Sequence, residues 1–259
     1  MRGVKITVLG CSGSVPGPGR STSGYLVEAE GTRLVLDLGS GTFGKLQTHC
    51  SPFDLDAVFL SHLHLDHCAD FSALTTYLRA HPEPPYSPYE RKLPVFAPEG
   101  AADRLANAHA ASRAELDSVC LENVFDFVPL RAGKIQVGPF DITVAPMRHI
   151  CEAYAFRVEC EGRSLVFSGD TAPCPELVEL SIGVDVLLAD AAWRDRGGRV
   201  DNLHMSGLEA AAIAAEAGAG RLLLTHVLPW SDRQGVLADA TTVFPGRTVL
   251  VEQDAVYEV

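Results

Sequence analysis

The two halves of the sequence show the same order of predicted strands and helices, and this internal repeat restricts the folds that the chain can adopt. Each half begins with a β-branched strand, continues with two apolar segments on either side of a Glu-Gly pair, and reaches a further apolar strand after a short helical segment. The matched strands are 5–10, 24–29, 32–37 and 57–60 in the first half and 140–144, 155–158, 164–167 and 184–189 in the second. Ile6 matches Ile142 and Phe59 matches Leu188, at offsets of 136 and 129 residues. Two similar strand-rich units whose sheets face each other, with helices outside, accommodate such a repeat.

This internal repeat predicts one domain built from two pseudo-repeats, about 1–98 and 135–259. With 259 residues, of which 47% are hydrophobic, the chain can bury a large core. Residues 99–118, between the repeats, are rich in alanine with charges interspersed, which predicts an exposed helical insert. The end of the chain adds helices over 207–217 and 232–240, the strand 221–224 between them, and two short closing strands.

A histidine-rich motif follows the apolar strand 57–60 directly. It places three imidazoles and a carboxylate within six residues, as His62, His64, Asp66 and His67. Zinc and similar divalent metals are bound by these side-chain types, and two metals together need about seven protein ligands. A chance cluster is the alternative, but three histidines alternating with leucine make it a poor one. We therefore expect the loop after this strand to carry four metal ligands.

The remaining ligands are expected at the carboxyl ends of other apolar strands. His149 follows the strand 140–144, Asp170 follows 164–167, and His226 follows 221–224. Strand ends on one side of a sheet are where α/β folds place their sites, so these side chains are expected to converge on the histidine motif. Taken singly, each has an ordinary alternative: a solvated loop histidine, a turn-forming aspartate, and a helix-capping histidine. Their shared position at strand ends favours the metal site.

Composition excludes several classes of function. No run of 18 apolar residues predicts a transmembrane helix, and residues 1–6 enter a strand pattern without room for a signal peptide. Seven cysteines without a Cys-x-x-Cys pair suit a reducing cytoplasm better than a disulfide framework. The net charge of −12 argues against extended contact with an RNA or DNA backbone, because that affinity comes from Lys and Arg.

The order of these residues resembles the metallo-β-lactamase superfamily. This resemblance spans the chain from residue 5 to about 230 and implies an α/β fold, a four-layer αβ/βα sandwich of two facing mixed sheets with outer helices. It also implies two divalent metal ions, with zinc as the first choice and manganese as the alternative. The implied ligands are His62, His64 and His149 for one metal, Asp66, His67 and His226 for the other, and Asp170 as the bridge. Asp66 is also counted as a catalytic residue.

The segments Ala189-Asp190-Ala191-Ala192-Trp193 and Leu203-His204-Met205-Ser206 resemble the acidic-residue and His-x-Ser/Thr motifs of the ribonuclease Z-like branch. In that branch the histidine donates a proton and the acidic residue orients it, which implies these roles for His204 and Asp190. The chemistry agrees, because two metals can generate a nucleophile from water, whereas an alkoxide leaving group benefits from a general acid. The alternative is an ordinary loop histidine. Ser206 and Glu209 form a predicted capping box that would fix its loop.

Two further segments resemble the same branch. The segment Val8-Leu9-Gly10-Cys11-Ser12-Gly13-Ser14 resembles that branch's first strand and Gly-rich turn. The turn is predicted either to aim backbone N–H groups at a phosphate or to form a tight turn beside the metals. Over its whole length the chain looks most like an actinobacterial group of ribonuclease Z-like proteins that includes cyclic-nucleotide phosphodiesterases. The segment 224–230 carries part of that likeness, and its Trp230 is predicted to stack on a base or to serve in packing.

The best-supported function from sequence is a cytoplasmic dinuclear-metal hydrolase, a phosphodiesterase acting on a small nucleotide ester such as a cyclic nucleotide. Only 20 residues separate His149 from Asp170, too few for the long tRNA-gripping arm of tRNA 3′-processing enzymes. The alternatives are a ribonuclease Z-like RNA endonuclease, a thioester or lactone hydrolase, and a non-catalytic metal-binding scaffold. The expected partner is a small phosphodiester or nucleotide, with no membrane, and a homodimer is left open.

Overall fold

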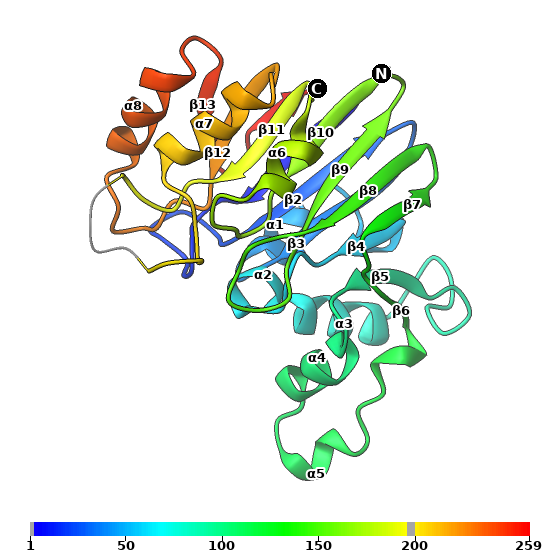
Figure 1. Ribbon diagram of the computed structural model, residues 1–259. Helices are drawn as coiled ribbons and strands as arrows, with labels where there is room; N and C mark the ends of the chain where they lie inside the picture. Colours follow the sequence, from blue (N-terminus) through cyan, green and yellow to red (C-terminus); the bar gives the residue numbers. More distant parts are fainter. Residues whose placement is uncertain (1–2, 196–199) are drawn as a thin grey trace.

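The computed structural model describes residues 3–195 and 200–259, and Met1 and Arg2 of the predicted N-terminal segment lie outside this range. Two seven-stranded sheets pack face to face with helices on their outer faces, which confirms the predicted four-layer sandwich (Figure 1). The first sheet has the strand order β14(Val256–Glu258), β1(Lys5–Gly10), β2(Gly24–Ala29), β3(Thr32–Leu38), β4(Ala57–Phe59), β5(Leu93–Ala97) and β6(Phe125–Pro129). The second has the order β13(Thr248–Leu250), β12(Arg221–Thr225), β11(Val186–Asp190), β10(Arg163–Phe167), β9(Tyr154–Cys160), β8(Phe140–Pro146) and β7(Gly133–Val137).

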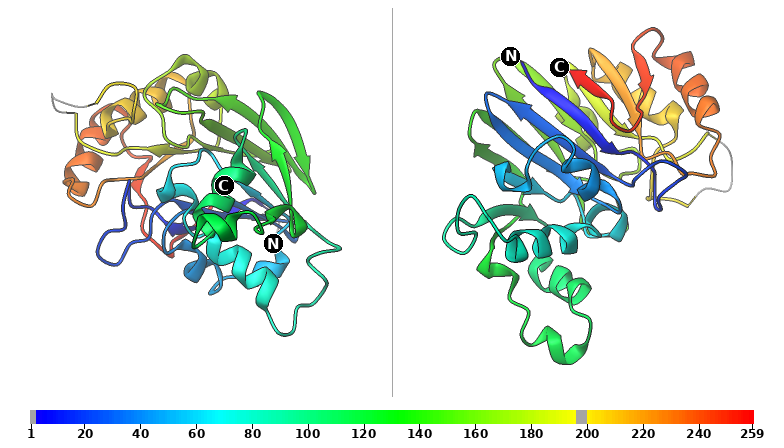
Figure 2. Two further views of the ribbon diagram at one scale, coloured as in Figure 1. Left: turned by 90° about the horizontal axis from the view of Figure 1, so that it is seen from below. Right: turned by 180° about the vertical axis from the view of Figure 1, so that it is seen from behind.

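Three apolar layers hold the sandwich together. In β3, Leu34 and Leu36 face the second sheet, whereas Val35 on the opposite face packs under the outer helices. Both faces of the strand are therefore buried, which explains why it is apolar at successive positions instead of alternating. The helices over the first sheet are α1(Thr42–Leu46), α2(Leu65–Cys68), α3(Phe71–Ala80) and α4(Ala101–His109). Those over the second are α6(Pro175–Ser181), α7(Gly207–Glu216) and α8(Arg233–Val243). Figure 2 shows these helices on the two outer sides of the paired sheets.

Both predicted hairpins are present. The turn between β2 and β3 places Glu30 at φ 49° and Gly31 at φ 83°, and the turn between β9 and β10 places Glu161 at φ 50° and Gly162 at φ 76°. Two successive residues with positive φ make the tight turn that matches the twist of antiparallel strands. In each sheet these hairpins are followed by a parallel partner, β4 beside β3 and β11 beside β10. The division of the chain into two repeats stays an inference from this pattern.

The structure adds strands that the sequence did not predict and divides the insert. β5 and β6 contain Pro94 and Pro129, which count against a strand, and β6 avoids the problem by lying at the sheet edge. The insert was predicted as one helix, but α4 ends at His109 and a second helix, α5(Arg113–Leu116), begins after Ser112. The Ser112 hydroxyl accepts a hydrogen bond from Glu115 N at 3.1 Å, which caps a new helix instead of continuing the old one. α5 projects away from the sandwich at the bottom of Figure 1.

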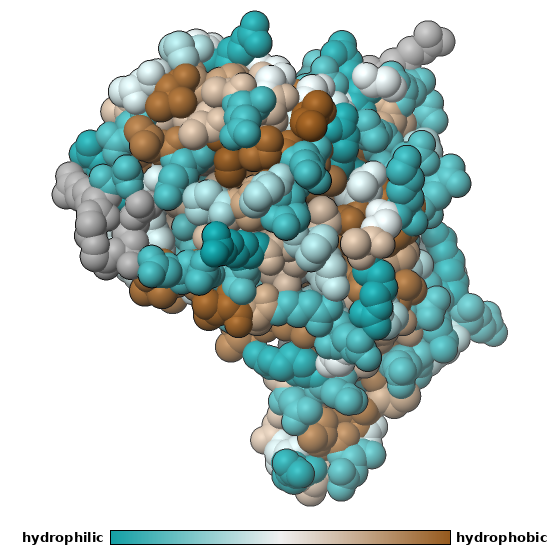
Figure 3. Space-filling view, viewed as in Figure 1, coloured by the Kyte–Doolittle hydropathy of each residue, from teal (hydrophilic) through white to brown (hydrophobic). Residues whose placement is uncertain are grey.

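The expected absence of a membrane partner stays a prediction. In the described part of the chain, no helix combines the length and the hydrophobicity that crossing a bilayer requires. The face shown in Figure 3 is largely hydrophilic, with apolar side chains gathered in small groups among the polar ones. The apolar groups are typical of an ordinary protein surface, much of which is contributed by carbon atoms.

Replacing Ser206 by alanine is expected to lower the free energy of unfolding by about 0.5–2 kcal/mol. The Ser206 hydroxyl accepts from Glu209 N at 3.2 Å, and Glu209 Oε2 accepts from Ser206 N at 2.8 Å, so the predicted capping box at the start of α7 is present. Chemical denaturation checks the loss. Ser118→Ala, at an exposed serine after α5, is the matched control, and an equal loss there would contradict the capping contribution.

Candidate metal centre and acid–base site

The predicted ligands meet at one edge of the sandwich, beyond the carboxyl ends of their strands. β4 leads to His62 and His64, β8 to His149, β10 to Asp170 and β12 to His226. Figure 1 shows α2 and the loop between β8 and β9 at this edge. The sequence predicted that the whole histidine motif lies on a loop, but its last part forms the short helix α2. A helix rises only about 1.5 Å per residue, so Asp66 and His67 lie close together, and both contribute donor atoms to the site.

Seven predicted side chains form two groups of donor atoms. Their atoms lie within 4.8 Å of one another in each group, and the groups are His62, His64 and His149, then Asp66, His67, Asp170 and His226. In the first group, His64 Nδ1 lies 2.9 Å from His62 Nε2 and 3.3 Å from His149 Nε2. In the second, His226 Nε2 lies 3.2 Å from His67 Nε2 and 3.1 Å from Asp66 Oδ2.

These separations are those of ligands that share a metal ion. With zinc–nitrogen bonds of 2.0–2.1 Å, ligand atoms around a tetrahedral ion lie about 3.3 Å apart. The donor set of imidazole and carboxylate also suits zinc or manganese. The residues present therefore fit two divalent metal ions, and the assignment of each ligand stays a proposal.

Asp170 lies between the two groups. Its Oδ1 is 3.2 Å from His67 Nε2 and 3.4 Å from His226 Nε2, and its Oδ2 is 3.8 Å from His62 Nε2. The side chain is 3% exposed, so no water shell replaces these contacts. One carboxylate thus faces both groups, as a bridging ligand would.

Burial and neighbouring charges shift the pKa values of the histidines in opposite directions. Burial holds the pKa of His62 well below its usual value, so this ring is neutral and has a free lone pair. Burial also lowers the pKa of His226, but Asp170, Asp190 and Asp66 outweigh it and raise the pKa to about 10. Without a metal, the second group therefore holds protons between its carboxylates. Since a metal must displace them, binding at neutral pH is expected to release protons.

Asp37 is a supporting residue that the sequence reasoning missed. This fully buried carboxylate lies 2.6 Å from His67 Nδ1 and accepts from Ser61 N at 2.7 Å and from Ser61 Oγ at 2.8 Å. It fixes the orientation of His67 and the start of the histidine loop together. The signal was available, because Asp37 lies near the end of an apolar strand and before Gly39-Ser40-Gly41, the criterion that selected Asp170.

Replacing Asp37 by asparagine is expected to weaken metal binding by about 10–100-fold, the usual effect of losing a buried carboxylate behind a histidine ligand. Asparagine suits this position because the backbone has φ 59°, a conformation that it tolerates. Competition with a chelator measures the affinity. Asp56→Asn is the control, since Asp56 also accepts a backbone N–H beside β3, from Arg33, but contacts no histidine. Unchanged affinity in Asp37→Asn would contradict the orienting role.

Asp190 and His204 form a pair against the second metal group. His204 Nδ1 lies 2.9 Å from Asp190 Oδ2, so the shorter aspartate side chain reaches the imidazole. Both are buried, and their atoms lie within 4.8 Å of those of Asp170 and His226. Asp190 Oδ1 is 3.5 Å from His226 Nδ1, and neither atom has a hydrogen bond within the described residues. One carboxylate therefore faces both the predicted proton donor and a predicted ligand.

The Gly-rich turn after β1 packs against the site instead of offering its amides to a ligand. Gly13 N donates to Val227 O at 3.1 Å, and Cys11 N and Ser12 N both donate to Ser21 O. A Cβ at Gly13 would lie 2.2 Å from His226 O, so only glycine allows this approach. The structure thus favours the tight-turn alternative. Cys151 is exposed, with Sγ 4.0 Å from His64 Nε2.

Comparison with known proteins places the chain in a family. A model of the beta-lactamase superfamily domain matches residues 32–227. Ribonuclease Z of Mycobacterium marinum is 31% identical over 253 residues, which cover 87% of each chain. The chain therefore belongs to the metallo-β-lactamase superfamily, as predicted, and its relatives include ribonuclease Z.

More similar sequences carry less functional information. The uncharacterized protein Rv1339 of Mycobacterium tuberculosis is 40% identical over 259 residues, covering 99% of this chain and 92% of that protein. The crystal structure of the metallo-beta-lactamase fold protein YhfI from Bacillus subtilis has a TM-score of 0.86 at 27% identity and covers 100% of both chains. Human tRNase Z, short form, has a TM-score of 0.72 at 22% identity over 98% of both chains, which shows the shared fold. Family and site together define a metal-dependent hydrolase.

Proposed function

We propose that this protein is a dinuclear-metal phosphodiesterase that acts on a small nucleotide ester, with a cyclic nucleotide as the first substrate to test. The observation that carries the proposal is the buried Asp190–His204 pair, at 2.9 Å, beside the predicted metal ligands. A general acid is most useful where an alkoxide leaves, as in phosphodiester hydrolysis. The leaving thiolate of a thioester needs no such acid.

The chain's own residues have separable roles in this reaction. When bound, two divalent metals would supply Lewis acidity and activated water. The seven predicted ligands would hold these ions: His62, His64, Asp66, His67, His149, Asp170 and His226. Asp66 would also face the nucleophile. Asp190 holds His204 through Nδ1, which leaves Nε2 to carry a proton to the departing oxygen. His149 Nδ1 lies 2.9 Å from Leu203 O, so the loop that carries His204 is also tied to the first metal group.

A small substrate is favoured over a large RNA. The interval between His149 and Asp170 is filled by β9 and β10 and their turn, which leaves no inserted arm there. The net charge of −12 also disfavours a long phosphate backbone. The 31% identity with a ribonuclease Z nevertheless favours RNA endonuclease activity as the second candidate. Thioester or lactone hydrolysis and a metal-binding scaffold are the remaining alternatives, and the expected cytoplasmic location stays a prediction.

A hydrolysis panel with zinc- or manganese-loaded protein tests the proposal. The substrates are bis-p-nitrophenyl phosphate, cAMP, cGMP, precursor tRNA and a thioester. We expect turnover of the phosphodiesters, with a higher kcat/KM for a cyclic nucleotide than for precursor tRNA. Dominant thioester turnover would overturn the phosphodiesterase assignment, dominant tRNA cleavage would select the endonuclease, and metal binding without any turnover would select the scaffold.

A further inference from the structure

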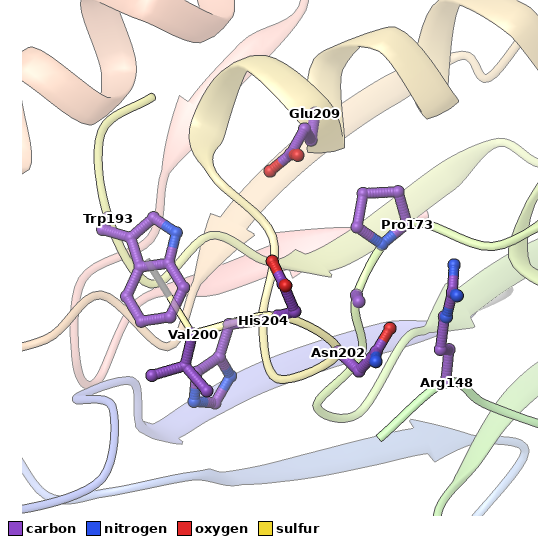
Figure 4. Close-up of a pocket in the computed structure, with 9 residues that line it drawn as sticks. Arg148, Pro173, Trp193, Val200, Asn202, His204 and Glu209 are labelled. Atoms are coloured by element: carbon purple, nitrogen blue, oxygen red, sulfur yellow. The ribbon is translucent and has the colours of Figure 1, made fainter. Parts of the chain in front are cut away.

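A pocket of about 470 Å³ adjoins the acid–base pair without including any predicted metal ligand. This volume lies within the range of small-molecule sites, roughly 300–1,000 Å³. Its lining includes Arg148, Trp193, Asn202 and His204 (Figure 4).

Residues that line the pocket lie on the same loops as the predicted metal ligands. Arg148 directly precedes His149, and its backbone is tied to the loop after Asp170 by the hydrogen bond from Ala172 N to Arg148 O at 2.8 Å. Ala172 itself lines the pocket. His204 is the residue shared between the pocket and the buried group around Asp190. A molecule in the pocket would therefore lie beside His204, whose Nδ1 is 2.9 Å from Asp190 Oδ2.

Three side chains that can donate hydrogen bonds line the pocket. Trp193 Nε1 is buried and has no hydrogen bond within the described residues. In Figure 4 the indole nitrogen lies on the side of the ring toward Glu209. The guanidinium of Arg148 and the carboxamide of Asn202 also line the cavity; both residues are exposed, and neither side chain has a hydrogen bond or ion pair within the described residues. Because the exposed Arg148 and Asn202 side chains are free to donate toward the cavity, the pocket suits a ligand rich in acceptors.

The indole of Trp193, which lines the pocket, favours a ligand with a flat ring. The indole of Trp193 packs edge-on against the His204 imidazole, with ring centroids 5.3 Å apart and an interplanar angle of 82°. This contact holds the indole beside the proton donor. A nucleoside combines a flat ring that can stack on an indole with ring nitrogens, carbonyls and hydroxyls that accept hydrogen bonds.

We propose that this pocket binds the nucleoside portion that carries the leaving oxygen of the substrate, with its base against Trp193. The inference rests on the proposed phosphodiesterase function, because only a nucleotide ester brings a nucleoside to His204. It assigns the substrate's base to Trp193, and not to Trp230, which is 69% exposed and does not line the pocket.

The two tryptophans of the chain make this assignment measurable by fluorescence. Trp230→Leu leaves Trp193 as the single reporter, and Trp193→Leu leaves Trp230. The probe is adenosine 5′-monophosphate, titrated into metal-loaded protein, with inorganic phosphate as a separate titration. We expect the nucleotide, but not phosphate, to quench Trp193 in Trp230→Leu. In Trp193→Leu we expect no quenching and, by calorimetry, affinity about tenfold lower, from the lost stacking.

Quenching of Trp230 alone, or full nucleotide affinity in Trp193→Leu, would overturn the proposal. Asn202→Ala provides a second variant should Trp193→Leu not fold, and it is expected to weaken the nucleotide more than phosphate. Equal weakening of both would also overturn it. The hydrolysis panel separates the two inferences: phosphodiester turnover without nucleotide binding at Trp193 removes only the pocket assignment. Nucleotide binding there without any turnover removes only the catalytic function.

Discussion

Replacing Asp170 by alanine is expected to deplete both metal ions and to lower phosphodiester hydrolysis by about 10³-fold or more, since the reaction would lose its electrophilic stabilisation and its activated water. The physical reason is position. Asp170 Oδ1 faces His67 and His226 at 3.2 and 3.4 Å, and Oδ2 faces His62 of the other group at 3.8 Å. Removing this carboxylate takes a negative charge and a donor atom from both groups at once.

Metal analysis after gel filtration measures this effect directly, and turnover of bis-p-nitrophenyl phosphate measures its consequence. Asp141→Ala is the matched control, because Asp141 is an exposed aspartate on β8 that contacts no predicted ligand. It is expected to retain two equivalents of metal. Loss of one equivalent, and not two, in Asp170→Ala would contradict the bridging role.

Replacing His204 by alanine is expected to lower turnover of a cyclic nucleotide by about 10²–10⁴-fold, the usual contribution of a general acid. Turnover of bis-p-nitrophenyl phosphate is expected to fall much less, because p-nitrophenolate leaves without a proton. Metal content is expected to stay near two equivalents, since His204 belongs to neither predicted ligand set. The dependence on the leaving group separates proton donation from a structural role.

His109→Ala serves as the control. His109 lies on the helical insert, outside the site, and its Nδ1 is 2.8 Å from the hydroxyl oxygen of Ser72 on α3. Equal losses for both esters in His204→Ala would show that His204 acts by some means other than proton donation. Asp190→Asn should reproduce the same dependence on the leaving group, since it removes the charge that holds the imidazole at 2.9 Å. A loss of metal in Asp190→Asn would add a role through His226, which faces the other carboxylate oxygen.

Elements that depend on local sequence were predicted, whereas elements that depend on pairing with distant strands were missed. Apolar runs on either side of a Glu-Gly pair predicted β2 and β3 and their hairpin, because short apolar segments and turn chemistry are local properties. The sequence pattern missed β5 and β6, whose prolines oppose a strand until neighbouring strands supply the pairing. It also predicted one helix in the insert, where the Ser112 cap produces two.

The sequence by itself determined the family, the ligand types and the strand ends that carry them, since these depend on residue identity and order. The tertiary structure alone decided that Asp37 supports His67 from 30 positions away, and that Asp190 reaches His204. It also decided that Trp193 lines a pocket whereas Trp230 is exposed. These outcomes depend on distances between residues far apart in the chain, which are fixed only when the two sheets pack and bring their strand ends to one edge.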